Sequence, residues 1–308
     1  MRRRTWIAAA IVALSITSVT VPATAQPGTS PRPSGDVTGD GRSDITARTS
    51  DGRLVVYPQI DGGNFGAPVT IGYGWRDVNY HWISTARADG SGSSDVVAAD
   101  LDGNLWLYPN AGFNGISTLR QRELAGKNFW DWADGFGKAV IRTVRGDGID
   151  DIERIYASDN ETSLYLFQNK LVPGDGHFEQ QLGVDRESKG RVVWTQYSEV
   201  PGSVTRGQYR DRIVEYANGR LAVQKLEFEG NTGRYREITL GWGWDTLDSL
   251  MLKEISGDGI PDLLGRRKSD GFLVAYVHSG QFDESNAYNT YLPPRALSYG
   301  WYTVDQIS

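Results

Sequence analysis

The sequence has 308 residues, no cysteine, and 38 acidic against 32 basic residues, for a net charge of −6. This acidic balance argues against nucleic acid or an anionic membrane as the partner, because either calls for a basic surface. Without cysteine the fold has no disulfides, and 37 glycines with ten tryptophans favour strands joined by tight turns.

The N-terminal segment has the pattern of an export signal. Arg2, Arg3 and Arg4 precede an apolar stretch at residues 6–21, and Ala23-Thr24-Ala25 forms an A-x-A cleavage site. We therefore expect a signal peptide at residues 1–25 and a secreted, extracellular protein without membrane insertion. Residues 26–34, QPGTSPRPS, are predicted to be a flexible linker.

Five copies of one template follow the linker. Each has a loop rich in Gly and Asp, a short apolar strand, a tight turn and a second strand. The first copy, GDVTGDGRSDITARTSDGRLVVYP, starts at Gly35, and the fifth, KEISGDGIPDLLGRRKSDGFLVAYV, starts at Lys253. Weaker copies begin at Ala86, Thr143 and Thr205, so the period is roughly 50 to 60 residues. Four short strands per period, without helical periodicity, are typical of a β-propeller blade.

The chain ends shortly after a third strand that leads into SYGW at residues 298–301. The same kind of segment, GWGW at residues 241–244, continues into the fifth copy, whereas the first copy lacks a preceding strand. We therefore predict an all-β fold over residues 35–308: a five-bladed β-propeller closed by pairing of the C-terminal strand with the N-terminal blade. The expected blades are residues 35–75 with 302–308, then 76–132, 133–184, 185–244 and 245–301.

The Gly and Asp loops of the first and fifth copies could hold Ca²⁺. This ion takes six to eight oxygens, which alternate residues of a tight loop can supply, and Gly permits the bend. The expected ligands in the first loop are the side chains of Asp36, Thr38, Asp40 and Asp44 and the carbonyl of Arg42. In the fifth loop they are the side chains of Glu254, Ser256, Asp258 and Asp262 and the carbonyl of Ile260.

These loops resemble those of the FG-GAP or VCBS repeat family, the integrin-α-like propellers whose blades carry D-x-D-x-D-G-x-x-D calcium loops. The resemblance covers residues 35–308 and implies Ca²⁺ at one or two sites. Thr38 and Ser256 replace a carboxylate of the family pattern, which predicts weaker affinity. The alternative is that Asp and Gly only form Asx-turns at the strand ends.

The other three loops depart further from this pattern. The second has Arg87 at the first ligand position, and the third has Thr143 and Arg145 at two positions. The fourth has Gln208 and Arg212 where carboxylates belong, so we expect no ion there.

Aromatic residues recur at the strand ends. Either they pack between blades or they form platforms on which sugar rings stack, with nearby Asp as hydroxyl acceptors. The candidate ligand-binding residues are Tyr73, Trp75, Asp77, Trp130, Trp132, Trp242, Trp244, Asp245, Tyr299 and Trp301.

No catalytic motif is recognisable. His81, His177 and His278 occupy non-equivalent positions, and the acids Asp150, Asp151 and Glu153 fall in a degraded loop. We expect a monomeric, non-catalytic, lectin-like module that binds glycan. A scaffold for an extracellular protein partner is the second hypothesis, and an extracellular hydrolase is the third.

Overall fold

A computed structural model of the chain describes the repeat region apart from several gaps. The described residues are 33, 35–129, 137–143, 149–157, 162–172, 174, 177–180, 184–186, 192–197, 204–207, 211–229 and 232–307. Pro31–Ser308 forms one compact unit. The predicted signal peptide and most of the predicted linker lie outside the described residues. Within these ranges, no helix is long and apolar enough to cross a membrane.

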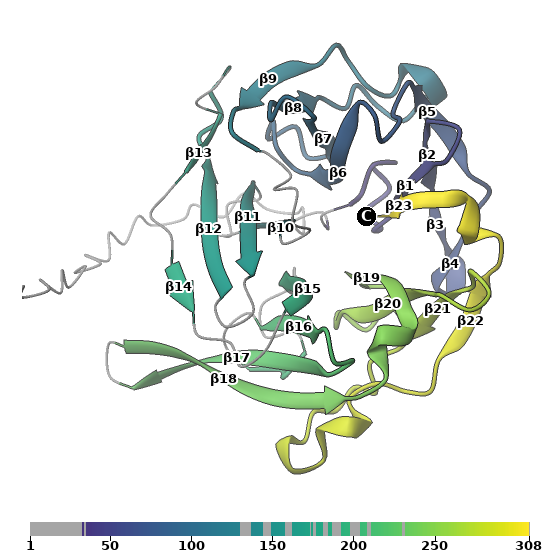
Figure 1. Cartoon of the computed structure of the whole chain (residues 1–308). Helices are drawn as coiled ribbons and strands as arrows, with labels where there is room; N and C mark the ends of the chain where they lie inside the picture. Colours follow the sequence, from purple (N-terminus) through teal and green to yellow (C-terminus); the bar gives the residue numbers. More distant parts are fainter. Residues whose placement is uncertain are drawn as a thin grey trace, which may run out of the picture. The chain divides into compact units, whose positions relative to one another are not determined.

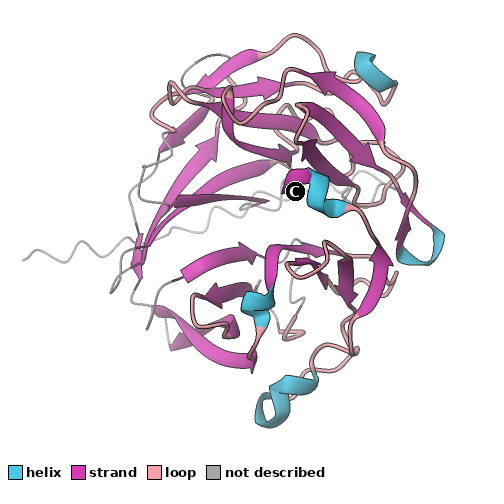
Figure 2. Cartoon of the chain, turned by 45° about the vertical axis from the view of Figure 1, so that its right-hand side comes forward, coloured by secondary structure: helices cyan, strands magenta, loops and turns pink. Residues whose placement is uncertain are grey.

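The unit is all-β with the arrangement of a β-propeller (Figures 1 and 2). Sheet 1 is formed, in spatial order, by β23 (Val304–Ile307), β1 (Ile45–Thr49), β2 (Arg53–Tyr57) and β5 (Val69–Tyr73). Sheet 2 contains β6 (Tyr80–Ala86), β7 (Asp95–Asp100), β8 (Leu105–Tyr108) and β9 (Glu123–Gly126). Sheet 3 contains β10 (Gly137–Thr143), β11 (Asp150–Ala157), β12 (Thr162–Asn169) and β13 (Phe178–Gln180), and β14 (Val184–Arg186) also pairs with β12.

Two more sheets complete the series. Sheet 4 contains β15 (Val192–Tyr197), β16 (Arg212–Tyr216), β17 (Leu221–Glu229) and β18 (Thr232–Gly241). Sheet 5 contains β19 (Leu247–Lys253), β20 (Asp262–Arg267), β21 (Leu273–Tyr276) and β22 (Arg295–Ser298). A small ribbon of β3 (Gln59–Ile60) and β4 (Asn64–Phe65) lies outside these sheets. The short 3-10 helices are η1 (Asp61–Gly63), η2 (Gly115–Ser117), η3 (Trp244–Thr246), η4 (Glu284–Asn289) and η5 (Trp301–Thr303).

The C-terminal strand pairs with the first repeat. β23 is antiparallel to β1, with Ala47 opposite Ile307 and Thr49 opposite Val304. The first strand of sheet 1 therefore comes from the C-terminal segment and the other three come from the N-terminal repeat. First strands of consecutive sheets also contact one another, since β10 touches both β6 and β15, and β15 touches β19.

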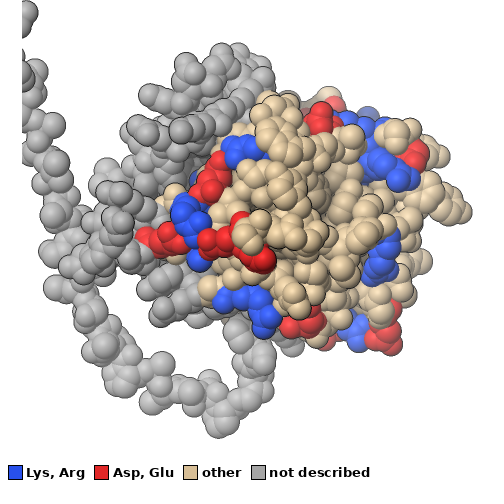
Figure 3. Space-filling model, turned by 90° about the horizontal axis from the view of Figure 1, so that it is seen from below, with Lys and Arg blue, Asp and Glu red and all other residues tan. Residues whose placement is uncertain are grey.

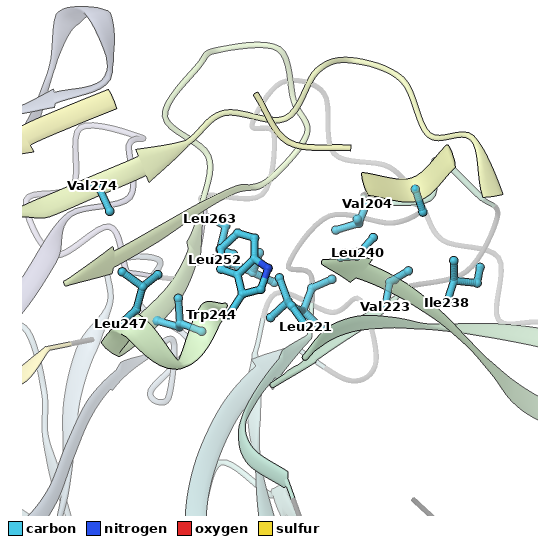
Figure 4. Packing of buried hydrophobic residues seen from close by; sticks show 13 residues of the cluster. Val204, Leu221, Val223, Ile238, Leu240, Trp244, Leu247, Leu252, Leu263 and Val274 are labelled. Atoms are coloured by element: carbon cyan, nitrogen blue, oxygen red, sulfur yellow. The ribbon is translucent and has the colours of Figure 1, made fainter. Parts of the chain in front are cut away.

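The hydrophobic core lies between neighbouring sheets. One cluster joins Leu221 and Val223 of sheet 4 to Leu252 and Leu263 of sheet 5, with Trp244 between them (Figure 4). Equivalent clusters lie between sheets 1 and 2, sheets 2 and 3, and sheets 5 and 1. Burying apolar side chains between sheets is therefore what holds the repeats together.

Candidate functional site

Four buried aromatic residues follow the last strands of their sheets. These corner aromatics, Trp75, Phe129, Trp244 and Trp301, are 4%, 4%, 9% and 3% exposed. Each donates its backbone N–H to the carbonyl of a turn glycine in its own sheet, namely Gly52, Gly103, Gly219 and Gly271 respectively. This shared hydrogen bond identifies the four aromatic residues as equivalent positions of their repeats.

The Gly-aromatic-Gly-Trp pattern has a steric cause. A Cβ at Gly72 would lie 2.3 Å from Nε1 of Trp75, so the first glycine makes room for the indole. The second glycine has a positive φ, as Gly74 does at 81° and Gly243 at 85°, which other residues rarely adopt. The motif therefore turns the chain sharply and directs the Trp side chain into the core.

Each corner aromatic contacts an aromatic residue of the next sheet. The pairs are Trp75 with Tyr108, Phe129 with Phe167, Trp244 with Tyr276, and Trp301 with Tyr57, with ring centroids 4.6, 4.5, 4.6 and 4.4 Å apart. The packing alternative thus accounts for these side chains. Our hypothesis that Trp75, Trp244 and Trp301 act as stacking platforms is wrong, because their rings are enclosed between two sheets.

The residues two positions earlier are exposed. Tyr73, Trp242 and Tyr299 have 68%, 58% and 81% of their surface accessible. They lie at the end of each sheet that carries the turn glycines, which we call the hairpin end. The opposite end carries the Asp loops and is called the loop end. Three repeats therefore present an aromatic ring to solvent at equivalent positions of the hairpin end.

The second repeat differs from the sequence-based expectation. Its corner position is occupied by Phe129, and the exposed position before it is Lys127. Trp130 and Trp132, which we had placed near this position, lie outside the described residues. A search for Trp at the corner position misses Phe129, because another large ring can also fill the space between the sheets.

Two predicted hydroxyl acceptors also lie at the hairpin end. Asp77 is exposed, and its carboxylate accepts the N–H of Val78 at 2.9 Å. The side chain of Asp245 lies against the turn at Gly219, where a Cβ would approach Oδ1 to 2.3 Å. Each carboxylate thus belongs to the same connection as an exposed aromatic residue, Asp77 to that of Tyr73 and Asp245 to that of Trp242.

At the loop end, the last Asp of each loop is buried and bonded to backbone. Asp44 accepts N–H groups of Val37 and Thr38 on Oδ2 and that of Gln59 on Oδ1. Asp95 and Asp262 accept three N–H groups in the same pattern. These carboxylates tie their loop to the end of the third strand. Each of these carboxylates therefore has a structural role in its loop.

The fourth loop contains the same acid, one residue earlier than we expected. The residue at this position is Asp211 rather than Arg212. Asp211 is completely buried and accepts the N–H of Thr205 at 2.7 Å, just as Asp44 accepts the N–H of Thr38. Arg206 has a φ of 55° at the position of Gly39. Aligning the fourth repeat by its apolar strand residues alone places the last position of the loop at Arg212, which is one residue too late. Gln208 lies outside the described residues.

The first ligand position distinguishes the first and fifth loops. Asp36 is completely buried and accepts the N–H groups of Gly39 and Gly41 at 2.7 and 2.9 Å. Glu254 accepts the N–H of Gly257 at 2.8 Å on Oε1, whereas its Oε2 is buried without a hydrogen-bond partner. Burial raises the pKa of Glu254, and the negative charges of Asp262 and Asp258 raise it further.

The remaining predicted ligands support the same loops. Asp40 and Asp258 each accept the N–H two residues on, from Arg42 and Ile260 respectively. The hydroxyl of Ser256 donates to Glu254 at 3.1 Å. Among the described residues, no group of three or more His, Asp or Glu side chains is close enough to hold a metal ion.

The second loop contains an ion pair instead of an acid at the first position. The guanidinium of Arg87 lies 2.8 Å from the carboxylate of Asp150 in sheet 3, and both side chains are buried. Asp151 accepts the N–H of Asn169 at 2.6 Å. Both acids therefore connect parts of the framework.

Two histidines join neighbouring sheets. The Nε2 of His177 lies 3.2 Å from the carbonyl oxygen of Ala88, and that of His278 lies 3.0 Å from the carbonyl oxygen of Val204. Burial lowers the pKa of both imidazoles and so favours their neutral form. At these positions, imidazole serves as an inter-sheet hydrogen-bonding group.

Comparisons with known proteins find only distant structural likenesses. No protein-family model matches the chain, and no curated protein matches it either. One similar solved structure is BBS1N in complex with ARL6DN, at 11% identity and a TM-score of 0.41, with 80% of this chain and 92% of that chain covered. Another is the rhamnogalacturonan lyase YesW, at 12% identity and a TM-score of 0.35, with 81% of this chain and 58% of that chain covered. Likenesses at this level carry no argument about activity or partners.

Proposed function

We propose that the protein is a secreted, non-catalytic recognition module that binds carbohydrate at its hairpin end. The observation that carries the proposal is the exposure of Tyr73, Trp242 and Tyr299 at equivalent positions of three repeats. Packing does not require a large ring there, because the corner aromatics already fill the space between the sheets. Exposed aromatic faces flanked by carboxylates suit sugars, whose rings present C–H groups on one face and hydroxyls at the rim.

The framework proposed for this surface is a five-bladed ring sealed by β23. Its support is the series of four- and five-stranded sheets, the pairing of β23 with β1, and the apolar cluster between sheets 5 and 1. Such a ring would hold the three aromatic positions in a fixed spacing. Fixed spacing allows several weak contacts to act together on a polymer of repeating sugars.

Ca²⁺ is proposed as a structural ion of the loop end, with the fifth loop as the preferred site. The first ligand position favours this loop, because the buried Oε2 of Glu254 lacks a partner, whereas both carboxylate oxygens of Asp36 accept N–H groups. In the first loop, Asp44 already has a buried cation nearby, since the Nζ of Lys253 donates to its carbonyl at 2.9 Å. A bound ion would neutralise the acids and stiffen the loop.

The buried histidines and the Arg87–Asp150 pair support a non-catalytic role, because these groups are engaged in the framework. A protein-binding scaffold remains the second hypothesis. It is favoured by Tyr288 and Leu292, which lie in the connection between β21 and β22 and are 60% and 48% exposed.

A glycan array tests the proposal. The wild-type protein should bind a group of structurally related glycans, and the variant Tyr73→Ala/Trp242→Ala/Tyr299→Ala should lose that binding. The Tyr288→Ala variant is the matched control, because it removes an equally exposed tyrosine at the loop end and should bind normally. Failure of the wild type to bind any glycan, or binding by the triple variant at wild-type strength, would overturn the proposal.

A further inference from the structure

The hairpin end of sheet 5 carries three aromatic rings rather than one. Tyr299 and Phe272 have ring centroids 6.1 Å apart, and Tyr299 is 81% exposed. Tyr302, 76% exposed, lies against the turn at Gly271, where a Cβ would come within 3.1 Å of its Cβ and Cδ1. Tyr302 thus lies beside the turn that precedes Phe272, and we call Tyr299, Phe272 and Tyr302 together the aromatic triad.

Equivalent positions in two other repeats are not aromatic. In sheet 1, Arg53 pairs directly opposite Tyr73, and Arg76 covers the turn at Gly52 as Tyr302 covers that at Gly271. In sheet 4, the corresponding residues beside Trp242 are Arg220 and Asp245. Among the repeats whose residues at these positions are described, the fifth therefore has the most aromatic side chains at its hairpin end.

The charged groups beside the triad neutralise each other. Arg267 forms two hydrogen bonds to Asp270, at 2.9 and 2.6 Å, and its guanidinium carbon lies 5.5 Å from the centroid of the Phe272 ring. Both side chains are about 40% exposed, so their remaining donors and acceptors face solvent. In the view of Figure 3, acidic and basic side chains of the described residues likewise lie beside one another.

We infer that the aromatic triad is the main carbohydrate subsite and that it takes the face of an uncharged pyranose ring. This inference rests on the proposed function and specifies its ligand. Tyr299 and Tyr302 supply apolar ring faces, and the Arg267–Asp270 pair supplies donors and acceptors for hydroxyl groups. A carboxylated sugar gains no net attraction here, because the charge of Asp270 cancels that of Arg267.

The subsite is also linked to the pairing of the C-terminal strand. Tyr302 lies in η5, which leads directly into β23, and the N–H of Ser50 in sheet 1 donates to the carbonyl of Thr303 at 2.9 Å. The position of Tyr302 therefore depends on the β23–β1 pairing, so that the subsite is complete only when this strand is in place.

Affinity electrophoresis in soluble polysaccharides tests the inference. The probes are a mixed-linkage β-glucan, a galactomannan and an arabinoxylan as neutral polymers, and polygalacturonate as the acidic one, each at low and high NaCl. At least one neutral polymer should retard the wild-type protein, with affinity unchanged within about twofold across the salt range because no net charge is involved. Tyr299→Ala and Tyr302→Ala should each weaken this retardation about tenfold, and Tyr288→Ala should not change it.

Two results would overturn this subsite while leaving the proposed function intact. One is salt-sensitive binding to polygalacturonate alone. The other is a Tyr302→Ala variant that binds as well as wild type while Trp242→Ala loses binding. Absence of retardation by every polymer, together with an empty glycan array, would overturn both. Melting temperatures of the variants separate loss of binding from loss of folding, since both tyrosines are mostly exposed.

Discussion

The guanidinium of Arg48 on β1 lies 2.6 Å from the carboxylate of Asp305 on β23, although 257 residues separate them. Arg48 is 6% exposed and also donates to the carbonyl of Tyr80, the first residue of sheet 2. Arg266 repeats this contact in sheet 5, where it binds Asp248 and the carbonyl of Val304. The side chain of Arg48 thus connects the C-terminal strand, the first repeat and the second repeat.

Replacing this arginine should destabilise the protein measurably. We expect Arg48→Met to lower the free energy of unfolding by about 2 to 3 kcal/mol, because one buried and one partly buried charge-assisted hydrogen bond are lost. Arg53→Met is the matched control, since its pairing with Asp51 is solvent-exposed and contributes less than about 1 kcal/mol. Urea denaturation measures both, and equal effects of the two substitutions would contradict the role given to Arg48.

The two tryptophans at the end of sheet 4 should behave oppositely. Trp244→Ala leaves a cavity in the cluster between sheets 4 and 5 and should cost about 3 to 5 kcal/mol. Trp242→Ala removes an exposed ring and should change stability by less than about 0.5 kcal/mol while it weakens glycan binding. Thermal melts and the glycan array together check this, and a large loss of stability in Trp242→Ala would count against the assignment.

Substitution of Glu254 distinguishes a role in Ca²⁺ binding from a role in the structure of the loop. Without Ca²⁺, Glu254→Gln should be as stable as wild type or more stable, because burial and neighbouring acids raise the pKa of the native carboxyl. Millimolar Ca²⁺ should raise the melting temperature of wild type and leave that of Glu254→Gln unchanged. The melts are compared in chelator and in Ca²⁺. If wild type shows no shift, the loops act only as turns.

Asp95 should make stability in chelator fall as the pH rises from 6.5 to 8.5, against the opposite contribution of His177 and His278, whose lowered pKa values add stability over this range. Burial raises the pKa of Asp95 to about 7, despite the N–H groups that donate to it. The pKa values of Asp44, Asp211 and Asp262 are also raised, mainly by burial. Because a carboxyl in the unfolded chain has a pKa of about 3.9, Asp95 binds more protons in the folded state than in the unfolded chain near pH 7. Urea titrations of wild type and Asp95→Asn at the two pH values isolate this carboxyl, because the histidines contribute to both proteins, and an equal pH dependence of the two would contradict the prediction.

Much of the framework could be predicted from the sequence, because repeated Gly and Asp loops, hairpin turns and apolar strands are local patterns. The pairing of Val304–Ile307 with β1 followed from comparing segment lengths. The position of Asp211 did not, since its loop shares few letters with the others and only backbone hydrogen bonds reveal the correspondence. Exposure of Trp242 beside buried Trp244 was also beyond the pattern, because it depends on which way the chain turns at Gly243.

Removal of residues 302–308 tests the central claim, that strands from both ends of the repeat region complete one sheet. This deletion removes Asp305, the partner of Arg48, and leaves β1 with an unpaired edge. Amide hydrogen exchange of the truncated and full-length proteins measures the consequence directly. The account predicts lost protection in β1, a lower melting temperature and loss of glycan binding at the aromatic triad. A truncated protein that keeps the protection of β1 and melts cooperatively at an unchanged temperature would contradict it.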